Sequence, residues 1–189
     1  LDLIAADAGS MDPGPYYLGA GQAFVSRPAA KRDLALMMVG GAKKGVPVFI
    51  GSAGGGGGDP HVDWLMEIVR EIAAENGLHP KVAVIRSEQS KDSLKAKVKA
   101  GKIAPLGPIA ELTEEEIDNS HRVVAMMGPE PFQKALEDGA DVVIAGRASD
   151  AAIYAAIPLM RGANPGLAWH LGKIIECGAQ VAEPRLGGD

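Results

Sequence analysis

The sequence predicts an α/β protein with an open, mostly parallel sheet of about five strands and helices on both faces. Apolar runs of four to six residues alternate with helical patterns of about ten or more, which is typical of βαβ units. Aromatic residues make up only 4% of the 189 residues, so the core must consist of Ala, Val, Ile, Leu and Met. There is no internal repeat, and the only low-complexity stretch is the glycine run at 54–58. We therefore expect one domain over residues 1–189.

The expected strands are short and apolar, as buried parallel strands are. They are the runs at residues 2–6, 46–50, 81–85, 123–126 and 141–145.

The first two expected helices have clear ends. One covers about residues 27–44 and stops at Gly45, and the next begins at Asp59 and Pro60 and stops at Gly77. Their inner faces carry apolar residues at helical spacing: Ala30, Leu34, Met37 and Met38 in the first, and Val62, Leu65, Val69 and Ile72 in the second.

Five further helices are expected downstream. A lysine-rich helix with Leu94 and Val98 inward stops at Gly101, and Thr113 begins a capping box for a short helix. The remaining helices are expected at 131–137, from Ser149 or Asp150 to about Met160, and at 167–177.

Charge, hydropathy and cysteine content exclude several classes of protein. The net charge of −5 leaves no basic stripe for a phosphate backbone, so we expect no nucleic-acid partner. The mean hydropathy is +0.05, and no apolar run approaches the roughly 18 residues of a membrane span. One cysteine and no signal-peptide pattern exclude a disulfide framework and fit a cytoplasmic protein, which we expect to be a homo-oligomer.

The polar and glycine-rich loops all follow expected strands. In a parallel sheet such loops meet at one edge, where ligands bind. They cover residues 7–17, 51–61, 86–90, 127–131 and 146–150, whereas the opposite loops are ordinary turns that end helices. This asymmetry predicts a functional site at the carboxyl edge.

The loop at 51–58 is a candidate anion site because backbone amides without side chains suit a phosphate or carboxylate. It lacks the Lys and Ser/Thr of a P-loop and the order of a dinucleotide fingerprint, so no nicotinamide or flavin signature is present. The alternative is a close-packed or flexible crossing loop. The ligand- and anion-binding candidates are Ser10, Ser52, Gly54, Gly55, Gly56, Ser87, Arg147 and Ser149.

Carboxylates and one histidine are the candidates for acid–base chemistry or for binding a divalent metal, whose ligands the sequence does not identify. They are Asp7, Asp12, His61, Glu88 and Asp150. Each also has a structural alternative: the aspartates can bond loop amides, His61 can be solvated or capping, and Glu88 can be a helix N-terminal charge. Arg147 suits a carboxylate or phosphate, and its alternative is an ion pair with Asp150 or Asp7.

Together these loops resemble the AtuA family, named for acyclic terpene utilisation, over almost the whole chain. The motifs are Asp7-Ala8-Gly9-Ser10, Asp12-Pro13-Gly14-Pro15-Tyr16-Tyr17-Leu18-Gly19, Gly51-Ser52-Ala53-Gly54-Gly55, Pro60-His61, Ser87-Glu88, Gly146-Arg147-Ala148-Ser149-Asp150 and Glu176-Cys177-Gly178. The five-glycine run is richer in glycine than the family pattern. The resemblance implies the N-terminal part of a longer protein, a small ferredoxin-like partner chain or domain, and breakdown of branched or terpenoid acids as CoA thioesters.

Two functions remain. The first is a hydratase or lyase acting on a small carboxylate or acyl-CoA, in which loop amides and Arg147 hold the anionic group and the acid–base candidates move protons. The second is a non-catalytic ligand-binding or scaffold subunit that works with the ferredoxin-like partner. A nucleotide-binding module is disfavoured by the missing fingerprints.

Overall fold

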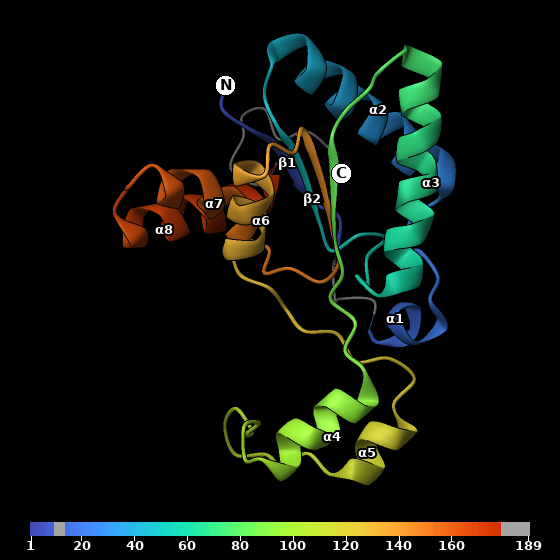
Figure 1. Ribbon diagram of the computed structural model, residues 1–189, viewed down its shortest axis with the longest axis vertical. Helices are drawn as coiled ribbons and strands as arrows, with labels where there is room; N and C mark the ends of the chain where they lie inside the picture. Colours follow the sequence, from blue (N-terminus) through green and yellow to red (C-terminus); the bar gives the residue numbers. More distant parts are fainter. Residues whose placement is uncertain (10–13, 179–189) are drawn as a thin grey trace, which may run out of the picture.

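The computed structural model describes residues 1–9 and 14–178. At its centre is a four-stranded parallel sheet in the order β1-β2-β4-β3 (Figure 1). The strands are β1 (Ile4–Asp7), β2 (Val48–Gly51), β3 (Val82–Ile85) and β4 (Val142–Ala145). Val142 pairs with both Val48 and Val82, and Ile4 pairs with Val48, so the strands are in step and their carboxyl ends form one edge. The predicted fold class is confirmed.

In the described residues, eight helices connect or flank the strands. They are α1 (Tyr16–Ala20), α2 (Arg27–Lys44), α3 (Asp59–Asn76), α4 (Lys91–Lys99), α5 (Glu114–Asn119), α6 (Glu130–Glu137), α7 (Ala152–Met160) and α8 (Pro165–Glu176). Within the described part of the chain, no helix is both long enough and apolar enough to cross a membrane.

The sheet is covered on both faces because its central strands alternate between two cores. Val48 and Ile50 of β2 pack with α2 and α3, whereas Phe49 between them packs with α6 and α7. Figure 1 shows the two helical layers on opposite sides of the strands. Every residue of β2 and β4 is buried, which explains their uninterrupted apolar sequences.

The segment at 123–126, predicted as a strand, is extended but joins no sheet. Val124 makes a single antiparallel bridge with Glu88, and Met127 makes a single parallel bridge with Ala148. Its bonds lie beyond the carboxyl ends of β3 and β4, where Ala125 donates to the carbonyl of Ser87. Because this segment joins no sheet, the sheet has four strands rather than about five. An apolar run alone does not distinguish such a connector from a strand.

Two other elements differ from the sequence prediction. The short helix α1 lies in a stretch that was expected to be part of a loop, and α7 begins at Ala152 after a turn in which the amide of Ala152 donates to the carbonyl of Ser149. The remaining helices and strands lie within two residues of their expected starts and ends.

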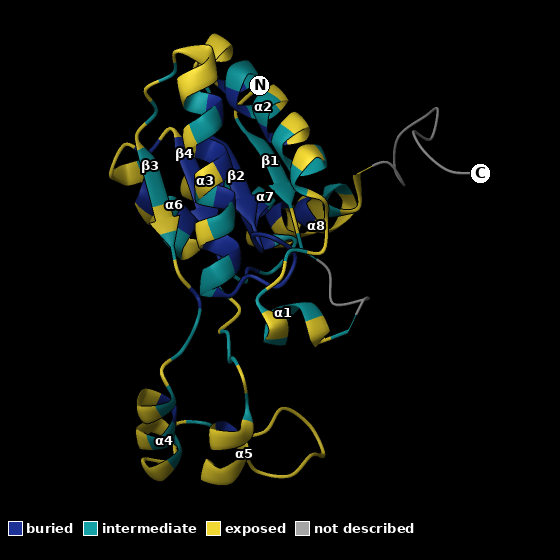
Figure 2. Cartoon of the chain, turned by 90° about the vertical axis from the view of Figure 1, so that its right-hand side faces the viewer, coloured by how far each residue is buried: buried dark blue, intermediate teal, exposed yellow. Residues whose placement is uncertain are grey.

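Helices α4 and α5 form a separate lobe that stands off the sheet on the side of α1 (Figures 1 and 2). We call residues 91–119 the α4–α5 lobe. Two connectors, residues 86–90 and 120–127, carry it and are bonded to each other where the amide of Gln89 donates to the carbonyl of Val123, 2.8 Å away. The capping box predicted at Thr113 is present at the start of α5.

The glycine loop after β2 is packed tightly rather than open. All residues from 51 to 58 are buried. Gly57 has a left-handed φ of +73°, and a Cβ on it would lie 2.3 Å from the amide nitrogen of Arg147. At this position glycine is required both by conformation and by the close approach of the loop after β4.

We predict that Gly57→Ala destabilises the protein much more than Gly45→Ala. Gly45 has a similar φ of +64°, but a Cβ there would meet nothing within 4 Å. Gly45→Ala should lower the free energy of unfolding by about 1 kcal/mol, from backbone strain alone. Gly57→Ala should lower it by about 1–3 kcal/mol more, because the crowded loops must separate. Urea unfolding of both variants measures the difference, and equal losses would contradict close packing at Gly57.

Candidate functional site

Asp7 lies at the carboxyl end of β1, an outer strand of the sheet. It is the last residue of β1 and is partly buried. Burial, and secondarily the nearby charge of Asp150, raise the pKa of Asp7 to about 6. Ser52, the amide of Gly9 and the charge of Arg147 act in the opposite direction. A carboxyl group with this pKa can accept and release a proton close to neutral pH.

Arg147 brings a guanidinium to the same edge from the loop after β4. Its side chain is 12% exposed, and its Nη2 lies 3.6 Å from Oδ1 of Asp150. Nη1 is buried and has no hydrogen-bond partner within the part of the chain described. A Cβ on Gly9 would lie 3.0 Å from this Nη1, so the guanidinium reaches the loop that follows Asp7. Such a nitrogen is suited to a carboxylate or phosphate oxygen.

Tyr154 of α7 is a site residue that the sequence analysis missed. Its hydroxyl oxygen accepts a hydrogen bond from the amide of Asp7, 3.3 Å away. Burial raises the pKa of Tyr154, and the charges of Asp7, Glu176 and Asp150 add to this effect. The phenol therefore stays protonated and can donate a hydrogen bond. No local sequence pattern marks it, because Tyr154 contacts Asp7 across 147 residues of chain.

Ser52 and Ser87 lie at the edge as expected, but their hydroxyls are engaged within the protein. Ser87 Oγ donates to the carbonyl of Gly57 at 2.8 Å and accepts from the amide of Arg147 at 2.7 Å. Ser52 Oγ lies 3.3 Å from both the amide and the carbonyl of Ala148. Both side chains are buried, so these serines position the loops that carry Asp7 and Arg147.

The predicted glycines and His61 are packed together. Gly54, Gly55 and Gly56 are buried, and a Cβ on Gly54 would lie 2.9 Å from Cβ of His61. His61 is fully buried in the first turn of α3, with Nε2 2.9 Å from the carbonyl of Gln22 and 3.1 Å from that of Tyr17. Because both partners are acceptors, Nε2 carries the proton. The ring therefore connects α3 to the α1 region.

Glu88 is held at the start of α3. Its Oε2 accepts from the amide of Asp59 at 2.9 Å, and its Oε1 lies 3.0 Å from Nη1 of Arg122. This is the arrangement of a helix N-terminal charge with an arginine partner.

The remaining predicted residues divide into two groups. Ser149 lies at the carboxyl edge, in the loop after β4. Its amide donates a hydrogen bond to the carbonyl of Met127. Ser10 and Asp12 lie outside the described residues. The structure thus brings together Asp7, Ser52, Arg147 and Asp150, and adds Tyr154.

An apolar cavity of about 350 Å³ opens beside Asp7, between the sheet and helices α2 and α3. Asp7 and Gly9 line it together with a set of mostly apolar side chains that includes Phe24, Val25, Leu34, Met37 and Trp64. The cavity can hold an aliphatic group, and Asp7 is among the residues that line it.

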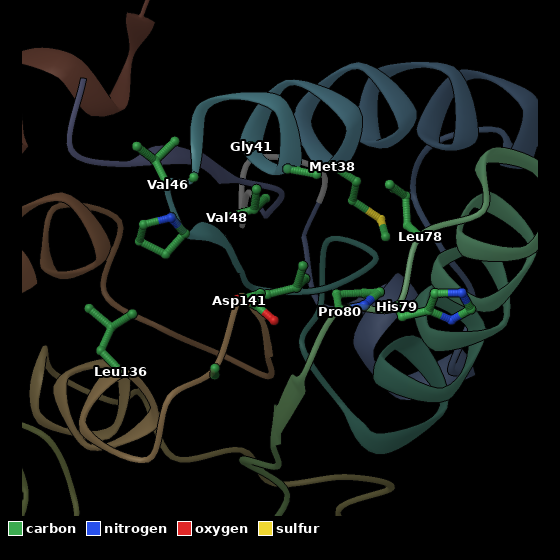
Figure 3. Close-up of a pocket in the computed structure, with 14 residues that line it drawn as sticks. Met38, Gly41, Val46, Val48, Leu78, His79, Pro80, Leu136 and Asp141 are labelled. Atoms are coloured by element: carbon green, nitrogen blue, oxygen red, sulfur yellow. The ribbon is translucent and has the colours of Figure 1, made fainter.

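A second cavity, of about 370 Å³, lies at the opposite, amino edge of the sheet (Figure 3). Its lining is mostly apolar, with Val48 and Leu78 among its walls. The one carboxylate among its lining residues, Asp141, accepts a hydrogen bond from the amide of Lys81 at 2.7 Å. This cavity lacks the unpaired arginine nitrogen and the raised-pKa carboxyl of the carboxyl edge.

The described residues contain no group of three or more His, Cys, Asp or Glu side chains placed to hold a metal ion. Among the described residues, the chemical groups at the carboxyl edge include carboxylates, a guanidinium and a phenol.

Comparison with known proteins identifies a family. The model of a family described as "Acyclic terpene utilisation family protein AtuA" matches residues 32–188. No curated protein and no solved structure matches the chain.

We predict that Asp7 makes stability fall as the pH rises from about 4 to 6. Across this range folded Asp7 keeps its proton while the unfolded chain loses it, so the free energy of unfolding should decrease by roughly 1–3 kcal/mol. Asp7→Asn should remove this decrease, and Asp33→Asn, which changes an exposed carboxyl lining the same cavity, should not. Urea unfolding at several pH values provides the comparison. If the wild-type and Asp7→Asn curves stay parallel, the pKa of Asp7 is ordinary.

Proposed function

Because the chain belongs to the AtuA family, which its description links to acyclic terpene utilisation, we propose that it is a hydratase or lyase acting on a branched or terpenoid acid or its CoA thioester. The observation that carries the proposal is the raised pKa of Asp7, which lines an apolar cavity and lies near Arg147, one of whose buried nitrogens has no partner among the described residues. These are the groups that proton transfer beside a carbonyl requires.

In the proposed reaction, the aliphatic part of the substrate lies in the cavity lined by Phe24, Met37 and Trp64. Arg147 binds the carboxylate or the carbonyl oxygen and stabilises the negative charge that develops there. Asp7 accepts the proton from the carbon next to that carbonyl. For a substrate with a hydroxyl on the following carbon, a second acid protonates the hydroxyl, the carbon–oxygen bond breaks and water leaves. The protonated phenol of Tyr154, whose oxygen accepts from the amide of Asp7, is our candidate for this second acid.

A ligand-binding subunit that works only with a partner chain is the second candidate. The observation in its favour is that the hydroxyls of Ser52 and Ser87 are used in internal hydrogen bonds, so fewer side chains remain for chemistry. This function requires the cavity and Arg147 to bind the ligand, but it requires no proton transfer by Asp7.

We predict that the protein catalyses exchange of the α-hydrogen of a branched 3-hydroxyacyl-CoA with deuterium from the solvent. Asp7→Asn should slow the exchange at least about 100-fold, because a general base typically contributes that much or more. The control variant Asp33→Asn should catalyse the exchange at the wild-type rate. Asp33 lines the same cavity, but it is exposed and paired with Arg32. Mass spectrometry of the recovered thioester measures the rate.

Arg147→Lys should weaken ligand binding about tenfold or more, because an ammonium cannot replace the forked guanidinium. Thermal shift with the same thioester measures this effect. Binding without exchange would favour the partner-dependent subunit, and neither binding nor exchange by any thioester or small branched acid would contradict both proposals.

A further inference from the structure

The loop after β2 begins with a strained serine. Ser52 has a φ of +49°, and it is the one non-glycine residue with a positive φ in the part of the chain that the structure describes. A residue with a side chain loses free energy in this left-handed conformation, whereas a glycine does not. The same loop has glycine at position 51 and from 54 to 58. The shape of the main chain therefore does not explain why position 52 is a serine.

The hydrogen bonds between Ser52 and Ala148 are too long to compensate for this strain. The Oγ of Ser52 lies 3.3 Å from both the amide nitrogen and the carbonyl oxygen of Ala148. Hydroxyl groups ordinarily bond to an oxygen at about 2.7–2.8 Å, and amides ordinarily bond to an oxygen at about 2.9–3.0 Å. Both bonds are weak, so the hydroxyl has another use.

Ser52 is packed on the turn that holds the carboxyl group of Asp7. In the ladder between β1 and β2, Asp7 pairs with Gly51, and the amide of Ala8 donates to the carbonyl of Gly51 at 2.9 Å. A Cβ on Gly9 would lie only 2.2 Å from the Cβ of Ser52. The amide of Gly9 donates in turn to Oδ1 of Asp7 at 3.4 Å. The fully buried serine thus lies beside the Asp7 carboxyl group.

The hydroxyl of Ser52 also favours the ionised form of Asp7. Burial raises the pKa of Asp7, and the charge of Asp150 adds to this effect. The hydrogen bond from Ser52 is the largest effect in the opposite direction, ahead of the charge of Arg147. The phenol of Tyr154, on α7, faces the main-chain amide of Asp7 and is protonated.

We propose that Ser52 is a positioning residue for Asp7: the strained main chain holds its hydroxyl against the carboxyl group, to which it donates a hydrogen bond when that group is ionised. A serine hydroxyl has one proton to donate. It donates to the carbonyl of Ala148 while Asp7 is protonated, and it turns to the carboxylate when Asp7 loses its proton. The role of Ser52 in catalysis rests on the proposed function, whereas its contact with Asp7 does not.

The first test needs no substrate. Ser52→Ala removes the hydroxyl and keeps the strain, whereas Ser52→Gly removes both. In both variants the fall in stability with rising pH should continue at least about 0.5 pH units beyond that of the wild type, because folded Asp7 keeps its proton to a higher pH. Urea unfolding between about pH 4 and 8 measures this shift. The control is Asp7→Asn, alone and combined with Ser52→Gly, and these two curves should run parallel.

The same variants test the strain. Ser52→Gly should unfold at a higher urea concentration than Ser52→Ala, because only glycine adopts the left-handed conformation without cost. The reverse order would contradict a strained main chain at this position.

The second test is the pH profile of the α-hydrogen exchange. Ser52→Ala should slow the exchange about two- to fivefold at about pH 6 and much less at about pH 8, because more of Asp7 is protonated at the lower pH. A serine that only supported the fold would lower the rate by the same factor at every pH.

Two results would overturn the proposal. One is a pH dependence of stability that loss of the hydroxyl leaves unchanged although both variants are folded, and the other is an exchange rate reduced equally at every pH. If the stability curves shift as expected but the wild type catalyses no exchange, the proposed function fails and the contact between Ser52 and Asp7 stands.

Discussion

The close approach of three loops around the main chain of Arg147 is the contact on which the rest of the carboxyl edge depends. The amide of Arg147 donates to Ser87 Oγ, and that hydroxyl donates in turn to the carbonyl of Gly57. The carbonyl of Arg147 accepts from the amide of Met127 at 3.0 Å. The loops after β2, β3 and β4 are thus joined at the main chain, which is possible only because Gly57 has no Cβ in the way. The guanidinium takes no part in this contact and remains available to the site.

The chemistry of the site follows from this arrangement. Main-chain bonds hold Arg147 in place, so its side chain can lie among Asp7, Asp150 and the loop at Gly9 with one nitrogen unpaired. Asp7 lies at the end of a strand, next to an apolar cavity, and its partial burial disfavours the charged carboxylate. Burial and a nearby carboxylate act against a nearby arginine, and the balance leaves the pKa of Asp7 near neutrality.

The α4–α5 lobe is connected to the same contact. Both of its connectors end at Arg147: one through the hydroxyl of Ser87, the other through the amide of Met127. A lobe built mainly of exposed residues is therefore attached at a rigid point of the protein.

The sequence by itself determined that helices cover both faces of a parallel sheet and that the polar loops gather at its carboxyl edge. Central strands such as 142–145 are continuous apolar runs because both faces of a parallel sheet are covered, and helix ends such as Gly45 and Gly77 are fixed by local conformation. The place of the site follows from the same local signals, because parallel strands bring their carboxyl ends together.

Only the tertiary structure decided which polar side chains at the carboxyl edge are used in internal hydrogen bonds and which are not. Ser87 and His61 are residue types common in functional sites, yet their side chains bond to main-chain groups distant in sequence. No local sequence pattern encodes those partners. The segment at 123–126 has the composition of a strand but pairs beyond the sheet, where it is part of the connector that returns from the α4–α5 lobe. Tyr154 joins Asp7 across 147 residues of chain. Such contacts depend on how the layers pack, which the period of a single helix or strand does not specify.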